Sequence, residues 1–120
     1  MASLKENALT KVATVNLVDM KTAASTALFT VPIGKTFYID TIVIRNNTAS
    51  LAGGTSYAFT NWRSGIDLSG MTVTTGYRKL FTVDNITYTP IAAGSVFYLV
   101  ITTGATLAGT ATIEVFGHLS

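Results

Sequence analysis

An uncharged stretch, residues 85–113, most constrains what this chain can fold into. Its longest unbroken apolar run covers only Val96 to Ile101, far short of the roughly 20 residues that a membrane-spanning helix needs. Pro90, Gly94 and Gly104 interrupt the stretch, and threonine is frequent between them. This combination is typical of β-strands that are buried on more than one side, and it argues against a membrane helix.

The composition is that of one domain with an excess of apolar side chains. The chain has 120 residues, which suffice for a single core but not for two. Charged residues make up 12%, about half of the usual share, and apolar residues make up 48% before glycine is counted. Some of this apolar surface is expected to lie in contacts with other subunits or partners. The alternative is a Thr- and Ala-rich β domain with a neutral surface.

Charge and cysteine content exclude several classes of protein. The chain has no cysteine, so a small disulfide-bonded scaffold is excluded. A net charge of +2 is too small for a nucleic-acid-binding surface, and no nucleic-acid or membrane partner is expected. The start of the chain has no apolar core after a basic head, so no signal peptide is expected.

Short runs of β-branched and aromatic residues predict an all-β, single-domain antiparallel β-sandwich of jelly-roll type. Strands are expected at residues 12–18, 26–31, 36–46, 55–62, 71–75, 78–84, 86–90, 95–103 and 110–118. The polar residues 1–11 predict a flexible N-terminal arm, which leaves 12–120 as the β-sandwich domain. Segments 46–54 and 63–70 are expected to be exposed loops, the first the more mobile.

Side-chain alternation predicts which face of the last strand is buried. One side carries apolar residues and the other mostly polar ones, which is typical of a half-buried antiparallel strand. The first side consists of Ile113, Val115 and Leu119, and the second of Thr112, Glu114, Phe116 and His118.

Segment 36–46 differs, because both of its faces are apolar if it alternates regularly. Phe37, Ile39 and Val43 would share one face, and Tyr38, Ile42 and Ile44 the other, beside Asp40. A two-layer sandwich buries only one face of each sheet, and segment 96–101 presents the same problem. The second face is therefore predicted to be an interface. Its candidate residues are Tyr38, Ile42 and Ile44 on the sheet, with Leu4 and Leu9 in the arm.

No pattern of residues indicates an enzyme, a metal site or a cofactor. The chain has one histidine, His118, and residues four apart on a strand, such as Glu114 and His118, are about 13 Å from each other. That separation is too long for the hydrogen bond that a catalytic pair requires. The scattered acidic residues have neither zinc nor calcium spacing. Asp40 is expected to pair with the backbone or with Arg45.

Aromatic residues next to cations suggest a second kind of function. Trp62 precedes Arg63, and Tyr77 precedes Arg78 and Lys79. Such aromatic rings can stack on sugars. A carbohydrate- or receptor-binding module with contacts from Tyr57, Trp62 and Tyr77 is therefore the alternative hypothesis, although tyrosine and tryptophan at strand ends more often complete a core or an interface.

From residue 12 onward the chain resembles the small β-sandwich proteins of tailed-phage virions, in particular capsid decoration or cement proteins. The similarity lies in size, low charge, absence of cysteine and the layout of two segments, 31–46 and 111–119. The resemblance implies a non-enzymatic structural protein on the capsid exterior of the virion. It implies a homotrimer that binds the major capsid protein. A trimeric adaptor in the tail or neck of the virion is a third possibility, and the alternative carbohydrate- or receptor-binding module would belong to a phage fibre or tail.

Overall fold

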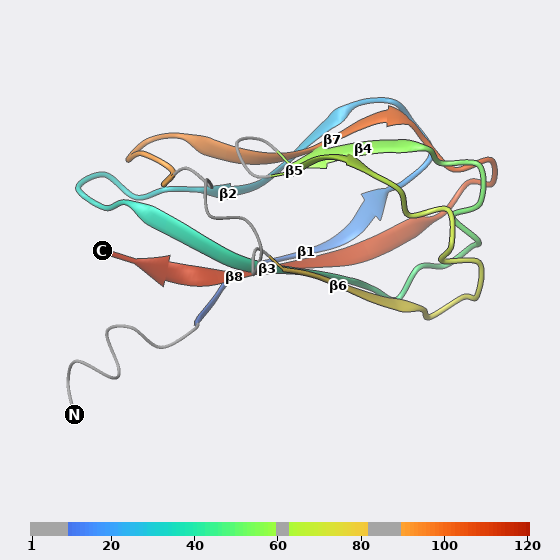
Figure 1. Ribbon diagram of the computed structural model, residues 1–120, viewed down its shortest axis with the longest axis horizontal. Helices are drawn as coiled ribbons and strands as arrows, with labels where there is room; N and C mark the ends of the chain where they lie inside the picture. Colours follow the sequence, from blue (N-terminus) through green and yellow to red (C-terminus); the bar gives the residue numbers. More distant parts are fainter. Residues whose placement is uncertain (1–9, 60–62, 82–89) are drawn as a thin grey trace.

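Two four-stranded antiparallel sheets packed face to face make up the protein, which is all-β over the described residues (Figure 1). The computed structural model describes residues 10–59, 63–81 and 90–120. The strands are β1 (Thr10–Asp19), β2 (Ser25–Thr30), β3 (Phe37–Arg45), β4 (Ser56–Phe59), β5 (Arg63–Ile66), β6 (Tyr77–Phe81), β7 (Val96–Thr103) and β8 (Thr110–Leu119). The predicted β-sandwich is confirmed.

Neighbours in the chain are seldom neighbours in a sheet. One sheet has the order β1-β8-β3-β6 and is called the β8 sheet; the other has the order β2-β7-β4-β5 and is called the β7 sheet. In Figure 1 the β8 sheet is the lower layer and the β7 sheet the upper one. Only β4 and β5 follow each other in both chain and sheet, so the other connections between these strands cross between the layers.

The predicted strands match the observed ones in part. Segment 71–75 is not a strand, although it is rich in β-branched residues, because Thr75 has a positive φ of 57° and its N–H donates to the carbonyl of Asn47. Residues 63–66, predicted as a loop, form β5. The predicted arm is shorter than 1–11, since β1 begins at Thr10, and residues 1–9 lie outside the described residues. The strand predicted at 86–90 lies almost wholly within residues 82–89, which are also outside the described residues.

A β-bulge at Asp40 resolves the problem of the two apolar faces of β3. Ile39 lies opposite Gly117 and Thr41 opposite Phe116, so Asp40 is an extra residue in the pairing of β3 with β8. The extra residue shifts the alternation by one place. Residues on both sides of it then face the core between the sheets: Phe37, Ile39, Ile42 and Ile44.

Gly117 gives the room that the ring of Phe37 needs beside this bulge. A Cβ on Gly117 would lie 2.3 Å from the Tyr38 carbonyl oxygen and 2.5 Å from Cε1 of Phe37. Such distances exclude any side chain there. Around Gly117, β8 alternates as predicted, with Ile113 and Val115 fully buried in the core and Leu119 packed against it.

The loop 46–54 is held firmly, although its composition predicts a mobile segment. Asn47 is fully buried, and its Nδ2 donates to the carbonyl oxygens of Ala49 (2.9 Å) and Val73 (3.0 Å), while its Oδ1 accepts from the N–H of Gly76 (2.7 Å). Leu51 is also fully buried. Composition alone does not predict that Asn47 and Leu51 are buried and fix this loop in place.

Candidate functional site

The outer surface of the β8 sheet carries a linked set of charges. Glu114 on β8 accepts from Arg45 Nε on β3 at 2.9 Å and from Lys11 Nζ on β1 at 3.0 Å. Its side chain is only 10% exposed. The hydrogen bond from Arg45, followed by that from Lys11, holds the pKa of Glu114 below its usual value, and Glu114 raises the pKa of Arg45 in turn. Asp40, which was expected to pair with the backbone or with Arg45, accepts a hydrogen bond from the hydroxyl of Thr41.

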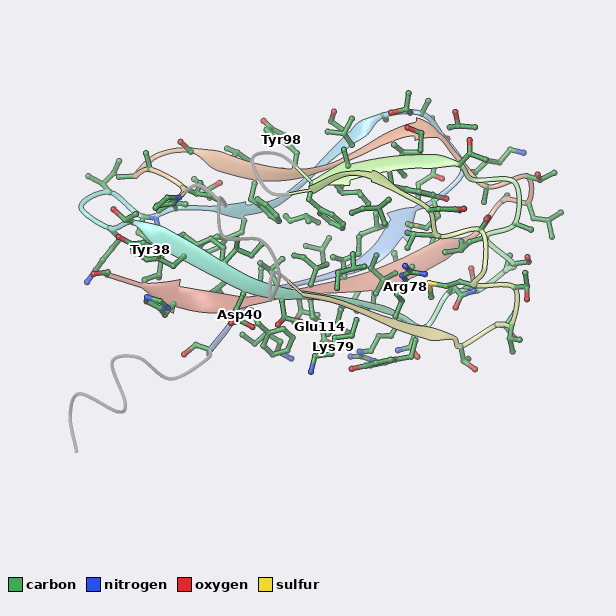
Figure 2. The ribbon with its side chains drawn as sticks, viewed as in Figure 1. Tyr38, Asp40, Arg78, Lys79, Tyr98 and Glu114 are labelled. Atoms are coloured by element: carbon green, nitrogen blue, oxygen red, sulfur yellow. The ribbon has the colours of Figure 1, made fainter. Side chains whose placement is uncertain are left out.

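We call the outer surface of the β8 sheet, with Lys11, Arg45 and Glu114, the charged face. Aromatic residues lie at its two ends. Tyr38 lies opposite His118, and their rings stack with centroids 4.9 Å apart and planes 14° apart. Tyr77, on the edge strand β6, is 64% exposed and lies opposite Arg45. Asp40, Lys79 and Glu114 all project away from the β7 sheet (Figure 2). The described outer surface of the β8 sheet therefore combines paired charges with two tyrosines.

The outer surface of the β7 sheet has the opposite character. None of the residues of the described strands β2, β7 and β4 is charged. Because Phe97, Leu99 and Ile101 are buried in the core, the residues between them point outward, and Figure 2 shows Tyr98 projecting away from the β8 sheet. We call this surface the uncharged face. It consists of Ser25, Ala27, Thr30, Ala58, Val96, Tyr98 and Val100.

Each edge of the sandwich has a feature that opposes pairing with a further strand. β1 has two irregularities against β8, and Leu17, 77% exposed, lies in one of them with a φ of 58°. β2 has a bulge between Ala27 and Phe29, and β5 has only 4 residues. On β6, Arg78 lies opposite the core residue Ile44 and so on the inner side of the edge (Figure 2). Bulges, short strands and inward-pointing charges are the usual protections against strand addition.

One tyrosine of the core has an unusual environment. Tyr57 is fully buried, and its hydroxyl has no hydrogen-bond partner among the described residues. A Cβ on Gly54 would come within 2.1 Å of that hydroxyl. Burial, and then the nearby charge of Asp67, raise the pKa of Tyr57. The hydrogen bonds from Ser69 lower the pKa of Asp67, and Arg78 contributes to the same shift.

The structure separates the residues that the sequence proposed as a subunit interface. Ile42 and Ile44 are fully buried in the core, so their assignment to an interface is wrong. The bulge at Asp40 shifts the alternation of β3 and turns both side chains inward. Tyr38 does lie on the outer face, half-buried against His118. Leu4 and Leu9 lie outside the described residues.

The three proposed glycan contacts do not form one platform. Tyr57 is in the core, so its assignment as a surface contact is wrong, because alternation in the short strand β4 turns it inward. Tyr77 is on the outer side of the other sheet, and Trp62 lies outside the described residues. The uncharged face as a unit is not among the sequence-based predictions, although the absence of charge in its three strands is visible in the sequence.

No group of three or more His, Cys, Asp or Glu side chains in residues 10–59, 63–81 and 90–120 is placed to hold a metal ion. Over the same residues, no helix has the length and apolar character needed to cross a membrane. Comparisons of the chain with protein-family models, with curated proteins and with solved structures find no match.

Proposed function

We propose that this protein is a non-enzymatic structural subunit of a tailed-phage virion, a capsid decoration or cement protein that assembles as a homotrimer on the major capsid protein. The observation that carries the proposal is the contrast between the two outer surfaces. The charged face suits contact with water, whereas the uncharged face suits contact with protein, since the centres of interfaces are depleted in charged residues.

The main titratable side chains near the charged face have structural partners, which supports a non-enzymatic role. His118, the chain's one histidine, is stacked on Tyr38. Glu114 is neutralised by Arg45 and Lys11. Catalytic use of either group would require it to give up these contacts, which hold neighbouring strands together.

We further propose that the sandwich is a jelly roll. The support is its eight described strands, divided into the antiparallel sheets β1-β8-β3-β6 and β2-β7-β4-β5. Repeated crossing between the two layers is what paired Greek keys require. Small β-sandwiches of this kind can present one sheet to a partner while the other remains solvated.

Cosedimentation with phage heads tests the proposed role. Purified protein is added to DNA-free heads of the phage from which the gene comes, and the mixture is centrifuged through sucrose. A decoration protein sediments with the heads and saturates at a fixed number of copies per major capsid subunit. The Tyr98→Lys variant, which puts a charge on the uncharged face, should bind less. Wild-type protein that stays at the top of the gradient contradicts the proposal.

The alternative, a glycan-binding module, is favoured by one feature, the exposed ring of Tyr77 opposite Arg45. Aromatic rings beside cations are suited to stacking on sugar faces. Fluorescence of the chain's one tryptophan during titration with a glycan library distinguishes the two functions. A saturable change that Tyr77→Ala abolishes favours glycan binding, and an unchanged spectrum favours the structural role.

A further inference from the structure

We propose that Leu17 anchors this protein to the shell that it covers, by inserting into an apolar pocket of the major capsid protein. This inference rests on the proposed function, and it names the residue and the chemistry of the contact. Leu17 lies in the irregularity of β1 between Val15 and Val18, and it is 77% exposed with a φ of 58°. In the described part of the chain, it is the one exposed large apolar residue whose backbone is also in the left-handed region.

The left-handed backbone at Leu17 costs free energy without an evident gain inside the subunit. Most side chains are strained at such a φ, whereas glycine adopts it freely and asparagine tolerates it. The other two described non-glycine residues with a positive φ fit the fold. Asn46 is of the tolerant type, and Thr75 donates its N–H to the carbonyl of Asn47, which fixes the loop 46–54. Leucine is not a tolerant type, and most of the Leu17 side chain lies in water.

Protection of the sheet edge does not account for a leucine at this position. The bulge interrupts pairing of β1 with a further strand whichever side chain it carries. An asparagine there would keep the bulge, relieve the strain and expose no apolar surface. Local strain that the fold does not need is typical of functional sites, where a side chain is held in the position that a partner requires. We therefore assign the Leu17 side chain to a contact outside the subunit.

Both neighbours of Leu17 are tied to the sandwich. Asn16 accepts a hydrogen bond through Oδ1 from the hydroxyl of Thr112 on β8 at 3.1 Å. Val18 is buried in the core between the sheets. The bulge therefore presents the Leu17 side chain to solvent from a fixed stretch of backbone. A side chain that is positioned before binding loses less conformational freedom when a partner covers it.

An apolar pocket on the head is the occupant that fits this position. Leucine has no hydrogen-bonding or charged group in its side chain, so only the burial of apolar surface favours its binding. β1 is in contact with β2, an edge strand of the uncharged face, so Leu17 lies on the side of the sandwich that borders this face. One neutral surface of the head can therefore cover the uncharged face and receive Leu17.

Cosedimentation with DNA-free heads, combined with thermal unfolding, tests the anchor. Leu17→Asn removes the apolar side chain and supplies a residue that tolerates the same backbone. Its melting temperature should rise by about 4 °C because the strain is relieved, whereas its affinity for heads should fall about tenfold or more. Leu17→Met keeps an apolar side chain and should bind heads nearly as well as the wild type.

Thr75→Asn is the matched control. It makes the same replacement at the other strained residue, which has a φ of 57° and is also exposed. Its melting temperature should rise in the same way, but its binding to heads should equal that of the wild type. A purely structural role for Leu17 predicts instead that the two variants behave alike.

The outcomes separate this inference from the proposed function. If the wild type and Leu17→Asn bind heads equally well, the anchor is overturned and the function stands; a lower oligomer mass of that variant would then place Leu17 between copies. A Leu17→Asn variant that melts below the wild type also overturns the anchor, because the leucine then packs within the subunit. A wild type that does not bind heads contradicts both proposals. Weaker binding by a Leu17→Asn variant that is at least as thermostable as the wild type, with Thr75→Asn unaffected, supports the anchor.

Discussion

Arg45 of β3 and Glu114 of β8 form an ion pair, with 2.9 Å between Nε and Oε1, that ties together the two central strands of the β8 sheet. Lys11 of β1 adds a second cation to the same carboxylate, so one acidic side chain connects three strands. Glu114 is almost fully covered, and its two partners shield it from water. The cluster therefore couples the stability of the sheet to pH.

Glu114 is expected to make the protein less stable in acid. Its folded-state pKa lies below the ordinary glutamate value of 4.5, so its contribution to stability is present above the unfolded pKa and is lost as the pH falls through the folded pKa. Urea unfolding of the wild type and of Glu114→Gln should differ most at neutral pH and least in acid. A difference between the two that is independent of pH would show that the carboxylate is not the source.

Ile42→Ala is expected to lower the free energy of unfolding by about 2–5 kcal/mol, because it leaves a cavity in the core. Ile42 is fully buried between the sheets. Val96→Ala, at a half-buried position on the uncharged face, is the control and should cost much less. Urea denaturation monitored by circular dichroism measures both. If Ile42→Ala lowered the free energy of unfolding only slightly and changed the mass of the oligomer, Ile42 would belong to a subunit interface instead.

Asn47→Ala is expected to cost about 2 kcal/mol or more, since it removes the hydrogen-bond partners of buried backbone groups. The amide of Asn47 contacts four backbone groups, and three of them, at Met71, Val73 and Gly76, are in a different loop. Hydrogen exchange at Gly76 should also become faster. Thr72→Ala, at an exposed position in the neighbouring loop, is the control and should leave both quantities unchanged.

Tyr57→Phe is expected to leave stability unchanged or to raise it by up to about 1 kcal/mol, because it removes a buried hydroxyl that has no partner among the described residues. The ring itself remains in the core. The free energy of unfolding in urea is the measurement. A loss of more than about 1 kcal/mol would mean that the hydroxyl is hydrogen-bonded to water in solution.

Periodicity predicted the sandwich and the faces of β8, because regular alternation reports burial directly. It failed on β3, where the bulge at Asp40 moves Ile42 and Ile44 into the core. The sequence does contain a sign of this bulge, since the polar pair Asp40 and Thr41 separates two alternating apolar pairs. The excess of apolar residues that suggested a second covered face of β3 is therefore packed within the subunit.

Other features depend on tertiary contacts that no local pattern reports. Asn47 and Leu51 lie in a segment whose composition is that of a mobile loop, but both are buried by neighbouring loops. The partners of Glu114 come from β1 and β3, which are distant in the chain. The uncharged face emerges only when the pairing of β2, β7 and β4 is known, because these strands are also far apart in the sequence.

The mass of the protein in solution tests the central claim, that this chain is an assembly subunit, most directly. Size-exclusion chromatography with light scattering, run over increasing concentrations, gives the number of copies per particle relative to the 12.7 kDa chain. The account predicts a particle of three copies, which is the proposed homotrimer. A monomer at every concentration would contradict it.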